Sequence, residues 1–313
     1  MRFVARQEVV DLNISNAAIV DALKSAFNAI RSGDIVGRPK SSIIQPDGAF
    51  YIGTHATWRK QNLGIFHCIM AAPPATVKPG EVHYRTYQLL TDYTRGAPIA
   101  LVDGSWTSTM LPAGVTAIGA RAFARPDSRI ATFIGAGLQS RVNLAALAER
   151  LPLQEVRVLG RSRANIDAFA DDVRSSGMQV TVHVDAEAAI RGADVIVTAV
   201  SGGPGMQPFL DPAWVSPGAF VSAVDVGRSW RDGFDAFDRI VTDDREQAKV
   251  QHAQGGLRYA GAFDTELADV ITGNRPPREL PDERIVMIHP GNIVGILGIT
   301  ALIHDRLQLN VRE

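Results

Sequence analysis

Residues 129–151 read RIATFIGAGLQSRVNLAALAERL, and this stretch decides the fold class. The apolar run 130–134 has the length and composition of a buried strand, whereas apolar residues recur at helical spacing after residue 138. Gly135 and Gly137 stand between the two runs. A strand that passes through a glycine turn directly into a helix opens a βαβ unit, which predicts an α/β fold.

The same alternation continues toward the C-terminus. Strands are predicted in EVRVLG (155–160), QVTVHV (179–184), DVIVTAV (194–200), AFVSAVDV (219–226) and RIVTDD (239–244), with helices in NIDAFADDVRSSG (165–177) and AEAAIRGA (186–193). Strands that alternate with helices of about 8–14 residues indicate βαβ units. We therefore expect a doubly wound parallel sheet of the Rossmann type.

The residues before this region follow a different pattern. Residues 15–32 have apolar side chains at helical spacing, with Ser15 as a candidate N-cap and Gly33 as a stop. Short β-rich runs follow within 40–70 and 84–102. One helix followed by consecutive strands predicts a smaller α+β domain built on a mostly antiparallel sheet.

The two regions imply a discontinuous domain arrangement. A helix within 105–128 is expected to join them, and a helical tail at 292–307 is expected to return to the first. The predicted domains are residues 1–112 with 290–313, and the Rossmann domain at 113–289. A chain of 313 residues is about twice the length of a typical domain, which favours the same division.

Composition narrows the class of protein. Thirty-two basic and 33 acidic side chains give a net charge of -1, so a nucleic-acid partner is not expected. Cys68 is the single cysteine, which predicts a reducing compartment and no metal site. The charged N-terminal residues do not resemble a signal peptide, and no apolar run is long enough for a membrane span. A soluble, cytoplasmic protein without a membrane partner is therefore expected.

The glycine turn predicts a dinucleotide site. Residues 135–140 form the pattern G-x-G-x-x-S, close to the usual G-x-G-x-x-G/A. Gly135 allows the tight turn, and Gly137 allows backbone N–H groups to approach a pyrophosphate at the start of the helix. Leu138 and Gln139 belong to the first helical turn and complete this predicted site.

The end of the next strand indicates which dinucleotide binds. An NAD site usually has Asp or Glu there, about 20 residues on, to bind the ribose 2′-hydroxyl. This chain has Arg161, Ser162 and Arg163 instead, and Glu155 lies too early in the strand. Two guanidinium groups and a hydroxyl suit a 2′-phosphate, so NADP is predicted in preference to NAD.

Two further strand ends should lie at the same edge of the sheet. Ligands of doubly wound sheets bind beyond the carboxyl ends of the strands. The cofactor cleft is therefore predicted to include Thr198, Ala199, Val200 and Ser201. Asp225 follows the next strand along the chain.

Nearly the whole chain resembles the ornithine cyclodeaminase/μ-crystallin family. The resemblance rests on GAPIALVDG (96–104), ARAFARPDSRIATFIGAGLQSRVNLAAL (120–147), VRVLGRSRANIDAFA (156–170), ADVIVTAVSG (193–202) and PGAFVSAVDVG (217–227). It implies a homodimer formed through the first domain, and a Rossmann domain that closes over an amino- or imino-acid-like substrate. The family includes cyclodeaminases, ketimine and pyrroline-carboxylate reductases, and alanine-type dehydrogenases.

The family's substrate-binding charges are missing here. The lysine of its G-x-K pattern corresponds to Phe66, and the arginine after its DG turn corresponds to Leu111. The catalytic aspartate position corresponds to Gly227, while Asp225 occupies the glycine position. Gly295-Ile296 replaces an acidic pair in the last helix, and an earlier arginine is matched by Arg38 or, by spacing, Lys40. A pocket with so few charges is expected to bind ornithine poorly.

Three residues are the candidate catalytic groups. Asp225 can serve as acid or base if burial raises its pKa, or it can cap the loop 226–232. His67 would need a strand bulge to turn toward a substrate, since side chains alternate along a strand; otherwise it faces solvent or the dimer mate. Lys40, with Arg38, can hold a carboxylate. His83 and His289 are weaker candidates, and Arg228, Arg231 and Asp232 are interpreted as a solvated loop.

The sequence supports a main function and two alternatives. The main one is an NAD(P)-dependent oxidoreductase that reduces an imine or oxidises an amine of an amino- or imino-acid-like substrate. The first alternative is the cyclodeamination of ornithine to proline and ammonia. The second is a cofactor-binding protein with little catalysis.

Overall fold

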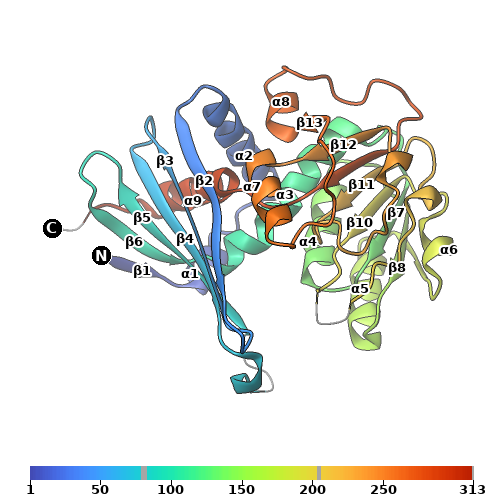
Figure 1. The fold of residues 1–313 in the computed structure, drawn as a ribbon, viewed down its shortest axis with the longest axis horizontal. Coiled ribbons are helices and arrows are strands. Elements are labelled where there is room, and N and C mark those ends of the chain that lie inside the picture. The colour runs from blue at the N-terminus through green and yellow to red at the C-terminus, as the bar shows by residue number, and fades with distance from the viewer. Residues whose placement is uncertain (79–82, 203–205, 312–313) are drawn as a thin grey trace. The chain divides into compact units, whose positions relative to one another are not determined.

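A computed structural model describes residues 1–78, 83–202 and 206–311 of the chain (Figure 1). The chain divides into two compact units. Unit 1 comprises Met1–Leu111 and Asn292–Glu313, and unit 2 comprises Pro112–Gly291. The division falls within helix α3 (Ser105–Phe123), which contains Pro112 in its interior.

A six-stranded mixed sheet forms the centre of unit 1. Its strands follow the order β1-β6-β5-β4-β3-β2. β1 pairs parallel to β6, and the other neighbours pair antiparallel. The strands are β1 (Arg2–Val4), β2 (Ile35–Ile44), β3 (Phe50–Trp58), β4 (Leu63–Ala71), β5 (Tyr84–Asp92) and β6 (Pro98–Asp103).

Helices cover one face of this sheet. The covering helices are α2 (Asn16–Arg31) and α9 (Ile293–Leu307), and unit 1 also contains α1 (Arg6–Asp11) and a short 3₁₀ turn η1 (Pro74–Thr76) in a connection. α2 begins as expected, because the Ser15 hydroxyl accepts a hydrogen bond from the Ala18 N–H. α2 and α9 pack closely: a Cβ at Gly298 would lie 2.9 Å from the Ala26 Cβ. The C-terminal helix thus belongs to the same unit as the N-terminal one.

Unit 2 is built on an eight-stranded sheet in which every pair of neighbours is parallel. The strand order is β13-β12-β14-β11-β10-β7-β8-β9. The strands are β7 (Ile130–Ile134), β8 (Glu155–Leu159), β9 (Gln179–Val182), β10 (Val195–Thr198), β11 (Phe220–Ala223), β12 (Arg239–Thr242), β13 (Thr265–Glu266) and β14 (Ile285–Ile288). The predicted parallel sheet is confirmed.

Both faces of the parallel sheet are covered. The helices of unit 2 besides its part of α3 are α4 (Leu138–Ala148), α5 (Arg163–Ser175), α6 (Ala186–Ile190), α7 (Arg245–Ala253) and α8 (Leu267–Ile271), with 3₁₀ turns η2 (Pro212–Trp214) and η3 (Phe234–Ala236). On one face Phe133 packs against Phe169 of α5, with ring centroids 5.2 Å apart. On the other face Trp230 is fully buried and packs with Phe237.

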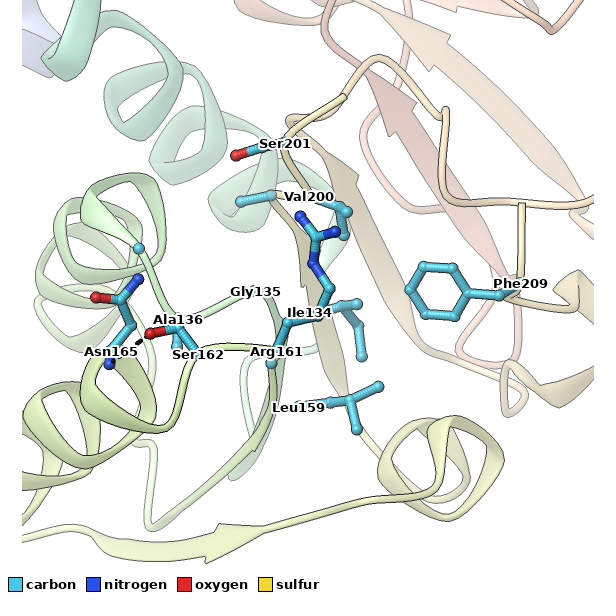
Figure 2. Close-up of a pocket in the computed structure, with 13 residues that line it drawn as sticks. Ile134, Gly135, Ala136, Leu159, Arg161, Ser162, Asn165, Val200, Ser201 and Phe209 are labelled. Carbon is cyan, nitrogen blue, oxygen red and sulfur yellow. Dashed lines mark hydrogen bonds between the residues drawn. The ribbon is translucent and has the colours of Figure 1, made fainter. Parts of the chain in front are cut away.

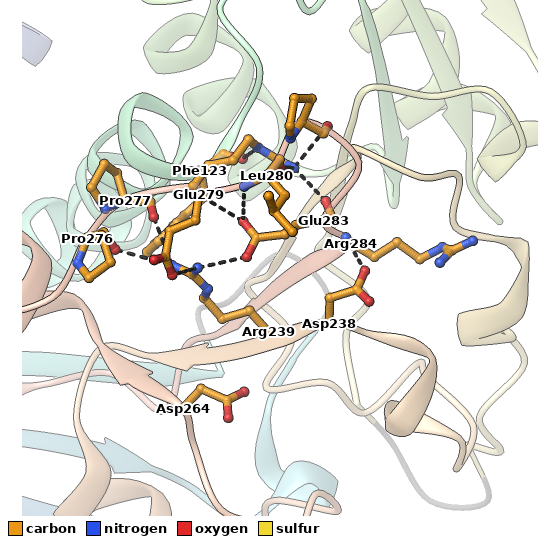
Figure 3. Close-up of polar contacts among 12 residues, drawn as sticks. Phe123, Asp238, Arg239, Asp264, Pro276, Pro277, Glu279, Leu280, Glu283 and Arg284 are labelled. Atoms are coloured by element: carbon orange, nitrogen blue, oxygen red, sulfur yellow. Dashed lines mark hydrogen bonds and ion pairs between the residues drawn. The ribbon is translucent and has the colours of Figure 1, made fainter.

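The segment before β14 is held by arginines (Figure 3). Arg278 donates to the carbonyl oxygens of Phe123 and Gly218, at 2.7 and 3.0 Å. Arg239 is buried and pairs with Glu283 at 2.7 Å. These contacts fix the segment to α3 and to the sheet without regular secondary structure.

The sequence prediction missed three strands: β1 in unit 1, and β13 and β14 in unit 2. β1 has three residues, which is too short for a periodicity to be recognised, and its parallel pairing with β6 leaves the unit 1 sheet mostly antiparallel, as predicted. Within the described residues, no helix is both long enough and apolar enough to cross a membrane.

Candidate functional site

A pocket of about 650 Å³ lies at the carboxyl ends of β7, β8 and β10 in unit 2 (Figure 2). This edge is where doubly wound sheets bind ligands. The residues that line it are Ile134, Gly135, Ala136, Gly137, Leu159, Gly160, Arg161, Ser162, Asn165, Ala199, Val200, Ser201 and Phe209.

The floor of the pocket is the glycine turn between β7 and α4. Gly135 has φ +106°, and a Cβ there would lie 2.6 Å from the carbonyl oxygen of Ala199. Gly137 is the N-cap of α4, and a Cβ there would meet no atom within 4 Å. Ser140 is fully buried and donates to the Gly135 carbonyl at 2.8 Å. The turn therefore leaves an open space over the N-terminus of an 11-residue helix.

The side wall of the pocket is the end of β8. Arg161 lines the pocket, and Figure 2 shows its side chain between Asn165 and Phe209 in that view. Ser162 caps α5 by accepting from the Asn165 N–H at 3.3 Å. Arg163 does not line the pocket; it pairs with Asp167 one helical turn later, at 2.9 Å.

The opposite wall follows β10. Ala199, Val200 and Ser201 line the pocket, as the sequence predicted, whereas Thr198 is buried beneath it. Leu138 and Gln139 are likewise absent from the lining residues. Sequence reasoning missed Asn165 and Phe209. Asn165 carried a recognisable signal, because it lies in the first turn of the helix that Ser162 caps, but Phe209 lies in a loop with no motif.

Asp225 lies below the sheet edge, within a network of hydrogen bonds. Its carboxylate accepts from the Thr198 hydroxyl at 2.8 Å, from the Ser229 hydroxyl at 2.6 Å and from the Gly227 N–H at 3.2 Å. Burial raises the pKa of the Asp225 carboxyl, and these three hydrogen bonds and the charge of Arg228 oppose that rise. This is the geometry of a carboxylate that caps the loop after β11.

His289 lies in a second buried network of unit 2. Its Nε2 is 2.9 Å from the Ser222 hydroxyl, which is itself 2.7 Å from the Thr116 hydroxyl. Burial lowers the pKa of His289 to about 3, so the imidazole is neutral at physiological pH.

The structure corrects our expectation for His67 in unit 1. β4 pairs with β3 and β5 in continuous register, without a bulge, yet His67 is buried on the helix-covered face and Phe66 is the outward residue. Side chains alternate along β4 as predicted, but the expected orientation, with position 66 inward and His67 outward, is wrong. Burial, with a smaller effect of the Lys40 charge, lowers the pKa of His67 to about 4.

Lys40 and His67 belong to one polar region of unit 1. β2 has a bulge between Arg38 and Ser41, which contains Lys40 and lies opposite Thr54, and Thr54 pairs with His67. Across β5, His67 pairs with Gln88, whose Oε1 accepts from the Thr300 hydroxyl of α9 at 2.9 Å. Five buried atoms in this unit have no hydrogen-bond partner within the described residues: His67 Nδ1, Thr86 Oγ1, Gln88 Nε2, Thr107 Oγ1 and Ser108 Oγ. Such atoms call for a water or a ligand group.

The pocket of unit 2 fits a dinucleotide. Gly135 and Gly137 have no side chains, so a pyrophosphate can approach the N-terminus of α4. The Arg161 guanidinium lies at the end of β8, where the ribose of a dinucleotide would lie. Together with the parallel sheet, this defines an α/β protein of the dinucleotide-binding class.

The comparison with protein families gives the particular assignment. The chain belongs to the ornithine cyclodeaminase/mu-crystallin family, whose model matches residues 2–308. It is 28% identical over 290 residues to a ketimine reductase mu-crystallin from Mus musculus, and this match covers 88% of each chain.

Solved structures share the fold over almost the whole length. The Δ1-pyrroline-2-carboxylate reductase of Thermococcus litoralis, in complex with NADH and L-proline, superimposes with a TM-score of 0.86 at 22% identity, covering 98% of both chains. An archaeal alanine dehydrogenase dimer with bound NAD gives a TM-score of 0.86 at 22% identity, covering 98% of this chain and 96% of the other. These relatives are nicotinamide-dependent oxidoreductases of amino and imino acids.

Proposed function

We propose that this protein is an oxidoreductase that uses NADP in preference to NAD and acts at an amine- or imine-bearing carbon of an amino- or imino-acid-like substrate. The observation that carries the proposal is the pocket over Gly135 and Gly137, with Arg161 in its wall. Family membership supports the reaction class.

The cofactor preference rests on Arg161 rather than on both arginines. Among the described residues, no carboxylate lines the pocket, so nothing there would bind a ribose 2′-hydroxyl as Asp or Glu does in NAD sites. Arg161 and Ser162 offer a cation and a hydroxyl to a 2′-phosphate. Arg163 contributes less, because its guanidinium is already paired with Asp167.

The chemistry follows from this class of cofactor. Bound nicotinamide supplies or accepts a hydride, and reduction of an imine to an amine also requires one proton at nitrogen. Asp225 is the proposed acid–base residue, because it follows β11 at the ligand-binding edge of the sheet and burial raises its pKa. His67 is neutral at physiological pH, so its proposed role is to hold the substrate by hydrogen bonds together with Lys40.

A second copy of the chain is the proposed partner. The outer face of the unit 1 sheet exposes Ile43, Tyr51 and Phe66, which line a shallow hollow of about 450 Å³. An apolar sheet face of this kind is typical of an interface. A homodimer formed through it also agrees with the dimer described for the archaeal alanine dehydrogenase.

The cofactor proposal is tested by titrating NADPH and NADH while following nicotinamide fluorescence. We expect tighter binding of NADPH, and Arg161→Ala should weaken it about 10-fold, as the loss of one charge-assisted hydrogen bond implies. NADH binding should change less than about 2-fold, because NADH has no 2′-phosphate for Arg161 to bind. Arg163→Ala is the matched control. Tighter binding of NADH by the wild-type protein would refute the preference.

The reaction proposal is tested by NADPH oxidation with cyclic and open-chain imines. Consumption of NADPH that stops in Gly137→Ala would support it. Asp225→Asn should lower kcat and remove one limb of the pH profile if Asp225 transfers the proton. An unchanged pH profile would leave Asp225 as a loop cap only. Turnover of ornithine to proline and ammonia would instead favour cyclodeamination.

A further inference from the structure

A second pocket of unit 2 has a positively charged wall. It has a volume of about 260 Å³, and its wall includes Gly202, Arg228, Gly256 and Arg258. Gly202 follows β10 and Arg228 follows β11, so this pocket also lies at the ligand-binding edge of the parallel sheet. Among the described residues, it shares no lining residue with the dinucleotide pocket.

Arg228 is partly buried, and its charge acts on the Asp225 carboxylate without a direct ion-pair contact. No hydrogen bond or ion pair of the described residues involves its side chain. The nearby carboxylate of Asp225 is already used by Thr198, Ser229 and the Gly227 N–H. The guanidinium instead lies against Gly202, where a Cβ would overlap its Nη1. Because Gly202 has no side chain, the Arg228 guanidinium can occupy this part of the pocket wall.

Arg258 has only a weak partner. It pairs with Asp232 at 3.2 Å, but the Asp232 side chain is 91% exposed. Exposed ion pairs contribute little and are screened by salt. The Arg258 guanidinium can therefore turn to a ligand at small cost.

Two guanidinium groups in one pocket favour an anion. A partly desolvated guanidinium without a direct hydrogen-bonded anion is unfavourable, and a carboxylate satisfies it through a bidentate pair. Arg228, which the sequence predicts to lie in a solvated loop, instead lines this pocket, and Arg258 supplies a second cation that the sequence did not point to.

We propose that Arg228 and Arg258 form an anion-binding pocket that holds a carboxylate of the substrate, so that the substrate is an acid anchored by unit 2. This deepens the proposed function and rests on it for the identity of the ligand as substrate. The site is separate from the residues expected to hold the cofactor phosphates, which are the Gly135–Gly137 turn and Arg161.

The test uses small dicarboxylates as probes. Malonate, succinate and glutarate are titrated calorimetrically into the NADPH-saturated full-length protein at low salt, with succinamate as the probe that lacks one carboxylate. We expect at least one dicarboxylate to bind, and Arg228→Met and Arg258→Met each to weaken it about 10-fold, as the loss of a charge-assisted pair implies. Succinamate should bind at least about 10-fold more weakly than succinate for the same reason.

Matched variants separate charge from folding. Arg231→Met is the control, because its guanidinium lies 5.8 Å from the Trp214 ring centroid and does not line the pocket. Arg228→Lys keeps the charge but loses the bidentate geometry, and should bind the dicarboxylate with intermediate affinity. Asp232→Asn removes the competing carboxylate of Arg258 and should tighten binding about 2-fold.

The outcomes distinguish this proposal from the proposed function. If NADPH binds but every dicarboxylate fails to bind, or binds equally to Arg228→Met and wild type, the anion pocket is refuted and the cofactor proposal stands. If Arg228→Met weakens NADPH rather than the dicarboxylate, the pocket serves the cofactor and the inference is wrong. If dicarboxylate binding depends on Arg228 but NADPH does not bind, the anion pocket is supported and the proposed function fails.

Discussion

At the scale of single residues, Gly135 and Gly137 do different work in the same turn. Gly135 has positive φ and touches the Ala199 carbonyl, so the fold itself requires a glycine there. Gly137 has ordinary φ and open space around its Cα, so only a ligand would require it. The motif therefore combines one structural and one binding position.

This difference gives a paired prediction. Gly135→Ala should lower the free energy of unfolding by about 2 kcal/mol, because of strain at positive φ and the close carbonyl, and should also abolish cofactor binding. Gly137→Ala should leave stability within about 0.5 kcal/mol of wild type while weakening NADPH at least about 10-fold. Urea unfolding and fluorescence titration measure the two effects. Equal destabilisation by both changes would contradict the assignment.

The two buried histidines predict an acid-sensitive stability. The pKa values of His67 and His289 are lowered to about 4 and about 3, from 6.5. Between pH 6.5 and these values the unfolded chain binds more protons than the folded one, so stability is present above pH 6.5 and is lost as the pH falls.

Each histidine should therefore lower the free energy of unfolding by about 2 kcal/mol as the pH falls from 7 to 5. His67→Gln and His289→Gln should each show a smaller loss over this range than the wild-type protein, as measured by urea unfolding at both pH values. Parallel pH dependence of wild type and both variants would show that the imidazoles are not held neutral.

The site was only partly predictable from the sequence. Gly135 and Gly137 follow from a motif whose spacing is set by the backbone, and Arg161 and Ser162 follow from their position at the end of the next strand. Asn165 and Phe209 were missed. Whether such a side chain lines the pocket depends on which face of a helix it occupies or on the path of a loop, and the motif specifies neither. Arg163 is four residues before Asp167, a spacing that favours an ion pair within a helix. The sequence alone could therefore have predicted that Arg163 pairs with Asp167 instead of lining the pocket.

At the scale of elements, the periodicity of apolar residues predicted which segments are strands and which are helices. It did not predict which face of a strand points toward the core. The βαβ alternation of unit 2 specifies a parallel sheet, because each helix returns the chain to the same edge. β4 illustrates the limit: LGIFHCIMA is apolar on both faces, so no alternation shows that His67 faces inward and Phe66 outward. Only pairing with β3 and β5, and coverage by α9, settles the phase.

The segment before β14 is stabilised by charge rather than by secondary structure (Figure 3). The Glu283 carboxylate accepts from Arg239 at 2.7 Å and from the Glu279 N–H at 2.9 Å. Arg239→Met would leave Glu283 buried without its cation, which should cost about 3–5 kcal/mol.

The double change Arg239→Met with Glu283→Gln tests this explanation. Because it removes both charges, it should recover a substantial part of the lost stability, as seen by urea unfolding. Arg284→Met is the control, since among the described residues this side chain bonds one carbonyl oxygen, that of Val215, and no carboxylate. Additive losses in the double variant would show that the pair is not coupled.

At the scale of the whole molecule, the chain leaves unit 1 within α3 and returns to it at Asn292. The unit 1 sheet is covered by α2 and α9 on one face, while its other face keeps large apolar side chains exposed. Ile43 is 61%, Tyr51 55% and Phe66 56% exposed. Leaving such a contiguous apolar surface in water is unfavourable, and a second copy placed sheet to sheet would bury it on both chains.

The proposed homodimer predicts a specific way to obtain monomers. Wild-type protein should elute in size-exclusion chromatography with light scattering at twice the chain mass. Tyr51→Lys combined with Phe66→Lys should give the single-chain mass, because two ammonium groups per chain would be desolvated and would repel their counterparts across the interface. Tyr93→Lys is the matched control, since Tyr93 is 46% exposed but lies in the turn between β5 and β6. A double variant that keeps twice the mass would place the interface elsewhere, and a wild-type monomer would refute the homodimer.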